Sequence, residues 1–89
     1  MTQKQYNNFI EFFKNEIRDA EETLERIESD LAGKERHLEH RRQHSEWSSY
    51  AIVLDRMQSL LRERCYWAGR LRDLRSALME AERRQPKTE

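Results

Sequence analysis

Apolar residues recur at alternating spacings of four and three over the first third of the chain. The series starts at Tyr6 and ends at Leu31 without a polar residue at any of its positions. Such a spacing places every member on one side of a helix and is typical of the seam of a coiled coil. The members are Tyr6, Ile10, Phe13, Ile17, Ala20, Leu24, Ile27 and Leu31.

A second series with the same alternation covers the last part of the chain. It starts at Tyr50 and ends at Ala81, and Arg64 is its only polar member. The pattern predicts a second amphipathic helix with its own seam. The members are Tyr50, Val53, Met57, Leu60, Arg64, Trp67, Leu71, Leu74, Leu78 and Ala81.

Local signals predict a first helix over about residues 3–43. Thr2 and Gln5 have the spacing of a capping box, which marks the start of a helix. Residues 32–49 lack proline and are rich in Glu, Arg and Lys, so we expect the helix to continue beyond Gly33. The alternative is a break at Gly33 followed by a short extra helix, because glycine often ends helices.

The second helix is predicted over about residues 46–84. Ser45 or Ser48 is suited to cap its start, because a hydroxyl oxygen can accept from the free backbone N–H groups there. Pro86 makes a sensible stop. We expect residues 85–89 to fray.

The two seams come into register when the chain folds back near residue 42, with a turn at about 42–46. Residues whose numbers add up to 84 then face each other, and the small Ala20 lies opposite the bulky Arg64. We therefore predict an all-α fold, an antiparallel and coiled-coil-like two-helix hairpin that forms a single domain over residues 1–89.

Composition and charge narrow the function classes. Ala, Glu, Lys, Leu and Arg make up 45 of 89 residues, with two glycines and one proline, which is typical of long helices. The 17 acidic and 17 basic residues cancel, so the overall charge gives no general affinity for nucleic acids or membranes. Cys65 is the single cysteine, and no apolar run is long enough for a signal peptide or a membrane span. We expect a cytoplasmic protein that makes no membrane contact.

The second helix carries more apolar surface than one neighbour can cover. Apolar residues extend from its seam to one side, which widens the apolar arc to roughly 160° at 100° per residue. An uncovered arc of this kind marks an interaction site. The predicted partner or dimer interface comprises Leu54, Leu61, Cys65, Trp67, Ala68 and Gly69. A second copy would cover it in a four-helix bundle of two hairpins, and a helix of a larger protein is the alternative.

The middle of the chain is its most basic segment. Three histidines there share one stripe of a continuous helix, where they could bind zinc or titrate together, but the neighbouring arginines disfavour a divalent cation. We therefore expect no metal and favour a solvated hairpin tip. The other hypothesis is that this tip contacts nucleic acid. Its candidate residues are Arg36, His37, His40, Arg41, Arg42 and His44.

Arg64 is the one charged side chain in either seam. A guanidinium in such a place needs a carboxylate partner, and its expected role is to fix the register or the oligomeric state. The candidate partners are Glu16, Asp19 and Glu21 of the first helix, or a residue of a partner subunit.

Enzymatic function has little support in the sequence. Cys65 lies far along the hairpin from the histidines, and no phosphate-binding loop or nucleophile elbow is visible. No cofactor is expected. We predict a small protein-interaction module, an adaptor or an inhibitor-type regulator, and a chain of this size suits a phage or plasmid accessory role. The alternative is a nucleic-acid-binding regulator that uses the basic tip.

Overall fold

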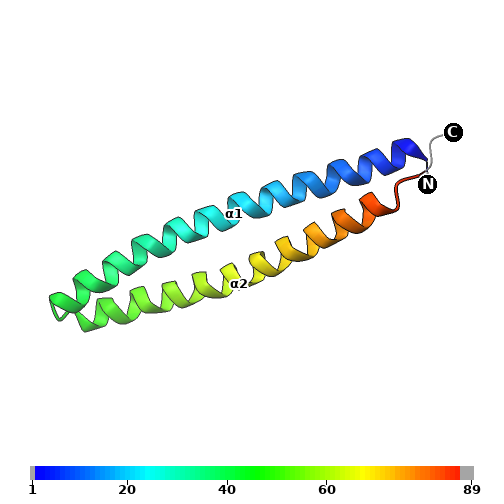
Figure 1. Cartoon of the computed structure of the whole chain (residues 1–89). Coiled ribbons are helices and arrows are strands. Elements are labelled where there is room, and N and C mark those ends of the chain that lie inside the picture. The colour runs from blue at the N-terminus through cyan, green and yellow to red at the C-terminus, as the bar shows by residue number, and fades with distance from the viewer. Residues whose placement is uncertain (1, 87–89) are drawn as a thin grey trace.

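Two long antiparallel helices account for most of the chain (Figure 1). The computed structural model describes residues 2–86. Helix α1 spans Gln3–Gln43 and helix α2 spans Trp47–Arg83. The chain reverses at one end of the rod, and the start of α1 lies beside the end of α2 at the other (Figure 1). The predicted all-α hairpin is confirmed, and the rod measures 71 × 14 × 13 Å.

The start of α1 is fixed by the predicted capping box. The Thr2 hydroxyl accepts a 3.1 Å hydrogen bond from the Gln5 backbone N–H, and the Gln5 side chain accepts one of 2.9 Å from the Thr2 N–H. These bonds satisfy two donors that a helix start otherwise leaves free. Helix α1 then continues through Gly33, which has no positive φ, so the break considered there does not occur.

The connection between the helices is a tight left-handed turn. Ser45 adopts a φ of 54°. The Ser45 N–H donates to the Arg42 carbonyl and the Glu46 N–H to the Arg41 carbonyl, at 3.1 and 2.9 Å. This is the bond pattern of a Schellman motif, which ends a helix with one left-handed residue.

The predicted serine cap of α2 is wrong. Glu46 is the N-cap residue, and no side chain caps the helix there. Ser45 is committed to the left-handed turn, and Ser48 already lies inside α2. Of the residues predicted to fray, Gln85 and Pro86 are non-helical, and 87–89 lie outside the described residues.

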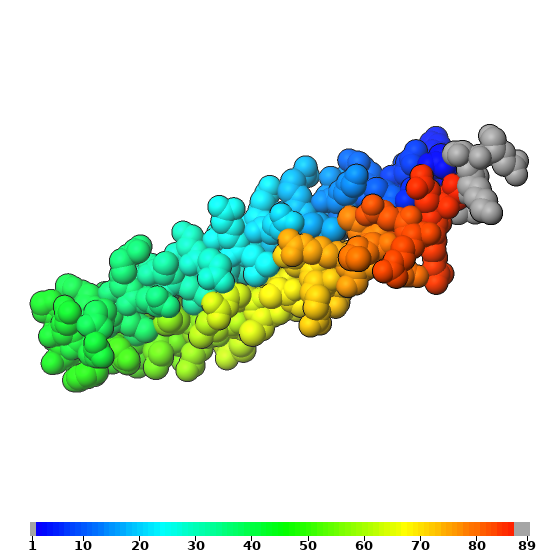
Figure 2. All heavy atoms as spheres, viewed as in Figure 1, coloured from blue at the N-terminus to red at the C-terminus, as the bar shows by residue number. Residues whose placement is uncertain are grey.

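The hydrophobic core is a single thin layer between the helices. Every member of both predicted seams is buried or half-buried. Side chains of α1 and α2 meet along the length of the rod (Figure 2). The buried residues are Tyr6, Ala20, Ile27, Leu31, Val53, Leu71 and Leu74.

The seams are correct, but the predicted register between them is wrong by one heptad. Ala20 packs in one cluster with Leu71 and Leu74, rather than against Arg64. The numbers of Ala20 and Leu71 add up to 91, which exceeds the predicted 84 by seven. A coiled-coil seam repeats every seven residues, so a slide of one heptad leaves apolar positions facing apolar positions. The turn decides between the two registers, because it lies at residues 44–46 and moves the point of reversal toward the C-terminus.

Candidate protein-interaction surface

One flank of α2 remains apolar and open to solvent beside the seam. Its members at seven-residue intervals are Trp47, Leu54, Leu61 and Ala68, and Cys65 lies between the last two. Trp47 is 59% exposed and Leu54 36%, while Cys65 and Ala68 are also exposed and Leu61 is half-buried. We call these five residues the α2 strip. A strip of this kind on a chain surface is a candidate binding site.

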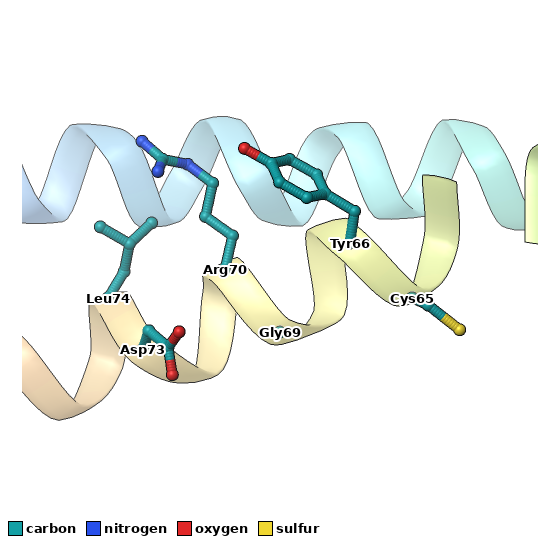
Figure 3. Close-up of a pocket in the computed structure, with 6 residues that line it drawn as sticks. All are labelled: Cys65, Tyr66, Gly69, Arg70, Asp73 and Leu74. Carbon is teal, nitrogen blue, oxygen red and sulfur yellow. The ribbon is translucent and has the colours of Figure 1, made fainter. Parts of the chain in front are cut away.

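The other two residues predicted for this interface lie elsewhere on α2. Trp67 packs against the Ala20 cluster of the core, with the ring of Tyr66 edge-on to it at 5.4 Å. Gly69 lies on the outer side of α2, where it lines a shallow groove (Figure 3). In this view Tyr66 and Arg70 extend toward α1, whereas the Cys65 side chain points away from it. The strip and the groove are therefore neighbouring surfaces that share Cys65.

An acidic row on α1 lies on the same side of the hairpin as the α2 strip. Arg75 follows Ala68 by seven residues, and its Nη2 donates to Oε1 of Glu21 at 3.2 Å. Glu28 and Glu35 follow Glu21 at intervals of seven, so they share its flank. Glu25 and Glu39 follow Glu21 and Glu35 by four residues, which is about one helical turn, and they complete the row. We call these exposed residues the α1 ridge: Glu21, Glu25, Glu28, Glu35 and Glu39.

Arg64 is half-buried in the seam, and its partner is Glu28. The distance from Nη1 of Arg64 to Oε1 of Glu28 is 3.5 Å. The partners expected from the sequence are wrong: Glu16 instead bonds Arg70 at 2.9 Å and Glu21 bonds Arg75. The cause is the one-heptad slide, because Glu28 follows Glu21 by seven residues.

The basic tip is largely neutralised by its own carboxylates. Arg41 contacts Glu46 at 2.7 Å and Arg42 contacts Glu39 at 2.6 Å. The hydrogen bond from Arg42 lowers the pKa of Glu39, and the one from Arg41 lowers the pKa of Glu46. The bond to Glu39 raises the pKa of Arg42 in turn. These pairs leave less positive charge for a phosphate backbone than the sequence alone implies.

The three histidines of the tip do not form one cluster. The rings of His40 and His44 lie 4.4 Å apart between centroids. His37 instead lines a groove between the helices together with Gly33 and Arg56. Within residues 2–86, no set of three His, Cys, Asp or Glu side chains is arranged to hold a metal ion. Arg36 is exposed on α1 close by.

The interface prediction omitted several exposed apolar residues, which are Phe9, Phe12, Trp47, Ile52, Tyr66 and Met79. Trp47 belongs to the α2 strip, and its spacing of seven from Leu54 is the signal that could have identified it. Phe9 and Phe12 form a patch at the open end of the hairpin, 49% and 54% exposed, with Phe13 edge-on to Phe12. Their signal was the presence of aromatic residues outside the α1 seam.

Neither helix contains, among the described residues, a segment apolar and long enough to cross a lipid bilayer. Comparisons of the chain with protein-family models, curated proteins and solved structures find no match.

Proposed function

We propose that the hairpin is a non-enzymatic protein-interaction module, an adaptor or an inhibitor-type regulator, whose α2 strip is covered by another helix. The observation that carries this proposal is the exposure of the strip. Helix α1 covers the α2 seam, yet Trp47 and Leu54 stay 59% and 36% exposed on the flank beside it. Apolar side chains in a continuous row gain free energy when a partner removes them from water.

The total surface of the chain supports the same proposal. Its solvent-accessible area is 7020 Å² for a mass of 10.9 kDa. A compact monomer of this mass exposes about 5600 Å². The excess, roughly 1400 Å², is larger than the ~800 Å² that one partner contributes to an interface of standard size. The exposed area of the rod beyond that of a compact monomer is therefore large enough to form an interface of standard size.

Two kinds of occupant fit a helical strip. A second copy would give a four-helix bundle of two hairpins, the homodimer that the sequence favours. A helix of a larger protein would make the chain an accessory regulator of the phage or plasmid type. Both occupants use the same α2 strip, so one pair of variants tests the surface itself.

A photo-crosslinking amino acid placed at Leu54, and separately at Ile52, tests the proposal in the native cell. Ile52 is the matched control, because it is 56% exposed on α2 but lies on the opposite flank. We expect protein adducts from position 54 and few from position 52. Leu54→Glu should abolish the same association in pull-downs, whereas Ile52→Glu should keep it. Equal crosslinking at both positions would contradict the proposal.

The nucleic-acid alternative has weaker support. Arg41 and Arg42 are held by Glu46 and Glu39, so the tip offers fewer free cations to phosphates. RNA or DNA binding at low salt that disappears in Arg41→Ala/Arg42→Ala would favour it over the protein-binding proposal.

A further inference from the structure

We infer that the occupant of the α2 strip is an amphipathic helix of about 20 residues with lysine or arginine along one flank, seated between the strip and the α1 ridge. This inference rests on the proposed function and specifies the partner of the same site. It follows from the apolar strip on α2 and the acidic ridge on α1 lying side by side along the rod.

The length of the occupant follows from the strip. Trp47 and Ala68 lie 21 residues apart on one continuous helix. At 1.5 Å per residue, they are separated by about 32 Å along the helix axis. A docked helix that covers the whole strip therefore has roughly the same number of residues, with apolar positions at spacings of three and four.

The charge of the occupant follows from the ridge. Glu21, Glu28 and Glu39 each contact an arginine of the chain. Glu25 and Glu35 make no ion pair within residues 2–86. These two exposed carboxylates are free to meet cations of a partner.

The register places the free carboxylates beside the strip. Residues whose numbers add up to about 91 lie level with each other, as Ala20 and Leu71 do. Leu61 is therefore level with residue 30, midway between Glu25 and Glu35. A helix that buries Leu61 would bring its flanking side chains within reach of both carboxylates, and opposite charge there favours binding and orientation.

The same arrangement argues against a second copy as the occupant. When two hairpins pack face to face about a two-fold axis perpendicular to the helices, strip meets strip and ridge meets ridge. Ten glutamates would then share one interface, of which Glu25 and Glu35 of each copy have no arginine. When the axis is parallel to the helices, each acidic ridge lies on the apolar strip of the other copy. Like charges or unpaired charges oppose association in both cases.

Two synthetic 21-residue helical peptides test the inference against the intact chain. Both carry leucine at the same positions with spacings of three and four. One carries lysine along one flank and the other carries glutamate at those positions. We expect the lysine peptide to bind about tenfold more tightly at low salt, as measured by calorimetry. Its lysines can form ion pairs with the free carboxylates of the ridge, whereas the glutamates of the other peptide are repelled by them. The difference should shrink in 1 M salt, because salt screens exposed charges.

Matched variants of the chain separate the ridge from general charge effects. Glu25→Gln/Glu35→Gln should lower the affinity for the lysine peptide severalfold. Glu22→Gln/Asp30→Asn removes the same charge from α1 but outside the ridge, and should leave its affinity nearly unchanged. All four residues are exposed, so the variants should fold. Circular dichroism checks that they do.

The outcomes distinguish this inference from the proposed function. Equal affinity for the two peptides, or equal effects of the two double variants, would overturn the inference that the partner helix has a basic flank. A stable dimer at low micromolar concentration that excludes the lysine peptide would overturn it in favour of a second copy. In each case loss of association in Leu54→Glu would still support the α2 strip. No effect of Leu54→Glu on any association would defeat the proposed function as well.

Discussion

Arg64 of α2 donates a 3.5 Å hydrogen bond across the hairpin to Glu28 of α1. All other positions of the α2 seam hold apolar side chains. Both side chains keep solvent contact, at 41% and 56% exposure. A pair in this setting contributes little net stability, because water competes for both charges. Its value lies in specificity, since it links two particular residues of otherwise repetitive helices.

Replacing Arg64 with leucine should therefore stabilise the hairpin. The new side chain completes the apolar seam at the cost of a weak ion pair, and we expect the free energy of unfolding to rise by about 1 kcal/mol in urea titrations. Arg62→Leu on the outer face of α2 serves as the control and should change stability by less than ~0.5 kcal/mol. A large loss of stability in Arg64→Leu would show that the pair with Glu28 matters more than the geometry implies.

The register can be tested by disulfide formation in a Cys65→Ser background. Ala20→Cys/Leu71→Cys should crosslink under mild oxidation, because Ala20 and Leu71 share one core cluster. Ala20→Cys/Arg64→Cys should stay reduced, because Arg64 lies a heptad away on α2. Electrophoresis without reductant measures both. The reverse result would restore the register in which residue numbers add up to 84.

Gly33→Ala should stabilise α1. Gly33 lies inside a continuous helix, and a Cβ there would approach only the Arg36 Nη2, at 4.0 Å. Alanine in a helix interior is favoured over glycine by roughly 0.5–1 kcal/mol, which thermal or urea unfolding can resolve. Gly69→Ala in α2 is a parallel case with nothing within 4 Å. Destabilisation by Gly33→Ala would indicate a break in α1 at this residue.

The tip should lose its ion pairs only in acid. Hydrogen bonds from Arg42 and Arg41 lower the pKa of Glu39 and of Glu46 below the ordinary 4.5. A carboxylate with a lowered folded-state pKa stabilises the fold above its unfolded pKa, and this contribution disappears as the pH falls through the lowered value. Carbon-detected NMR titration should therefore give both midpoints below 4.5. Arg41→Ala should raise the midpoint of Glu46 and leave that of Glu39 in place; unchanged midpoints would contradict the tip geometry.

Much of the site could be read from the sequence, and the omissions have identifiable causes. Leu54, Leu61, Cys65 and Ala68 were found because apolar residues beside a seam are visible in the heptad pattern. Trp47 was missed because it is the first residue of α2 and precedes the start of the α2 seam at Tyr50. The neutralisation of Arg41 by Glu46 was missed because it depends on the path of the turn, which no periodicity describes.

The sequence by itself determined the two helices, their seams and the capped start at Thr2, because hydrophobic spacing and capping chemistry act over a few residues. Only the tertiary structure decided the register, the partner of Arg64 and the placement of the α1 ridge beside the α2 strip. A heptad pattern matches itself after a slide of seven residues, so the pattern cannot choose between registers. The left-handed turn at Ser45 and the packing of Ala20 against Leu71 make that choice.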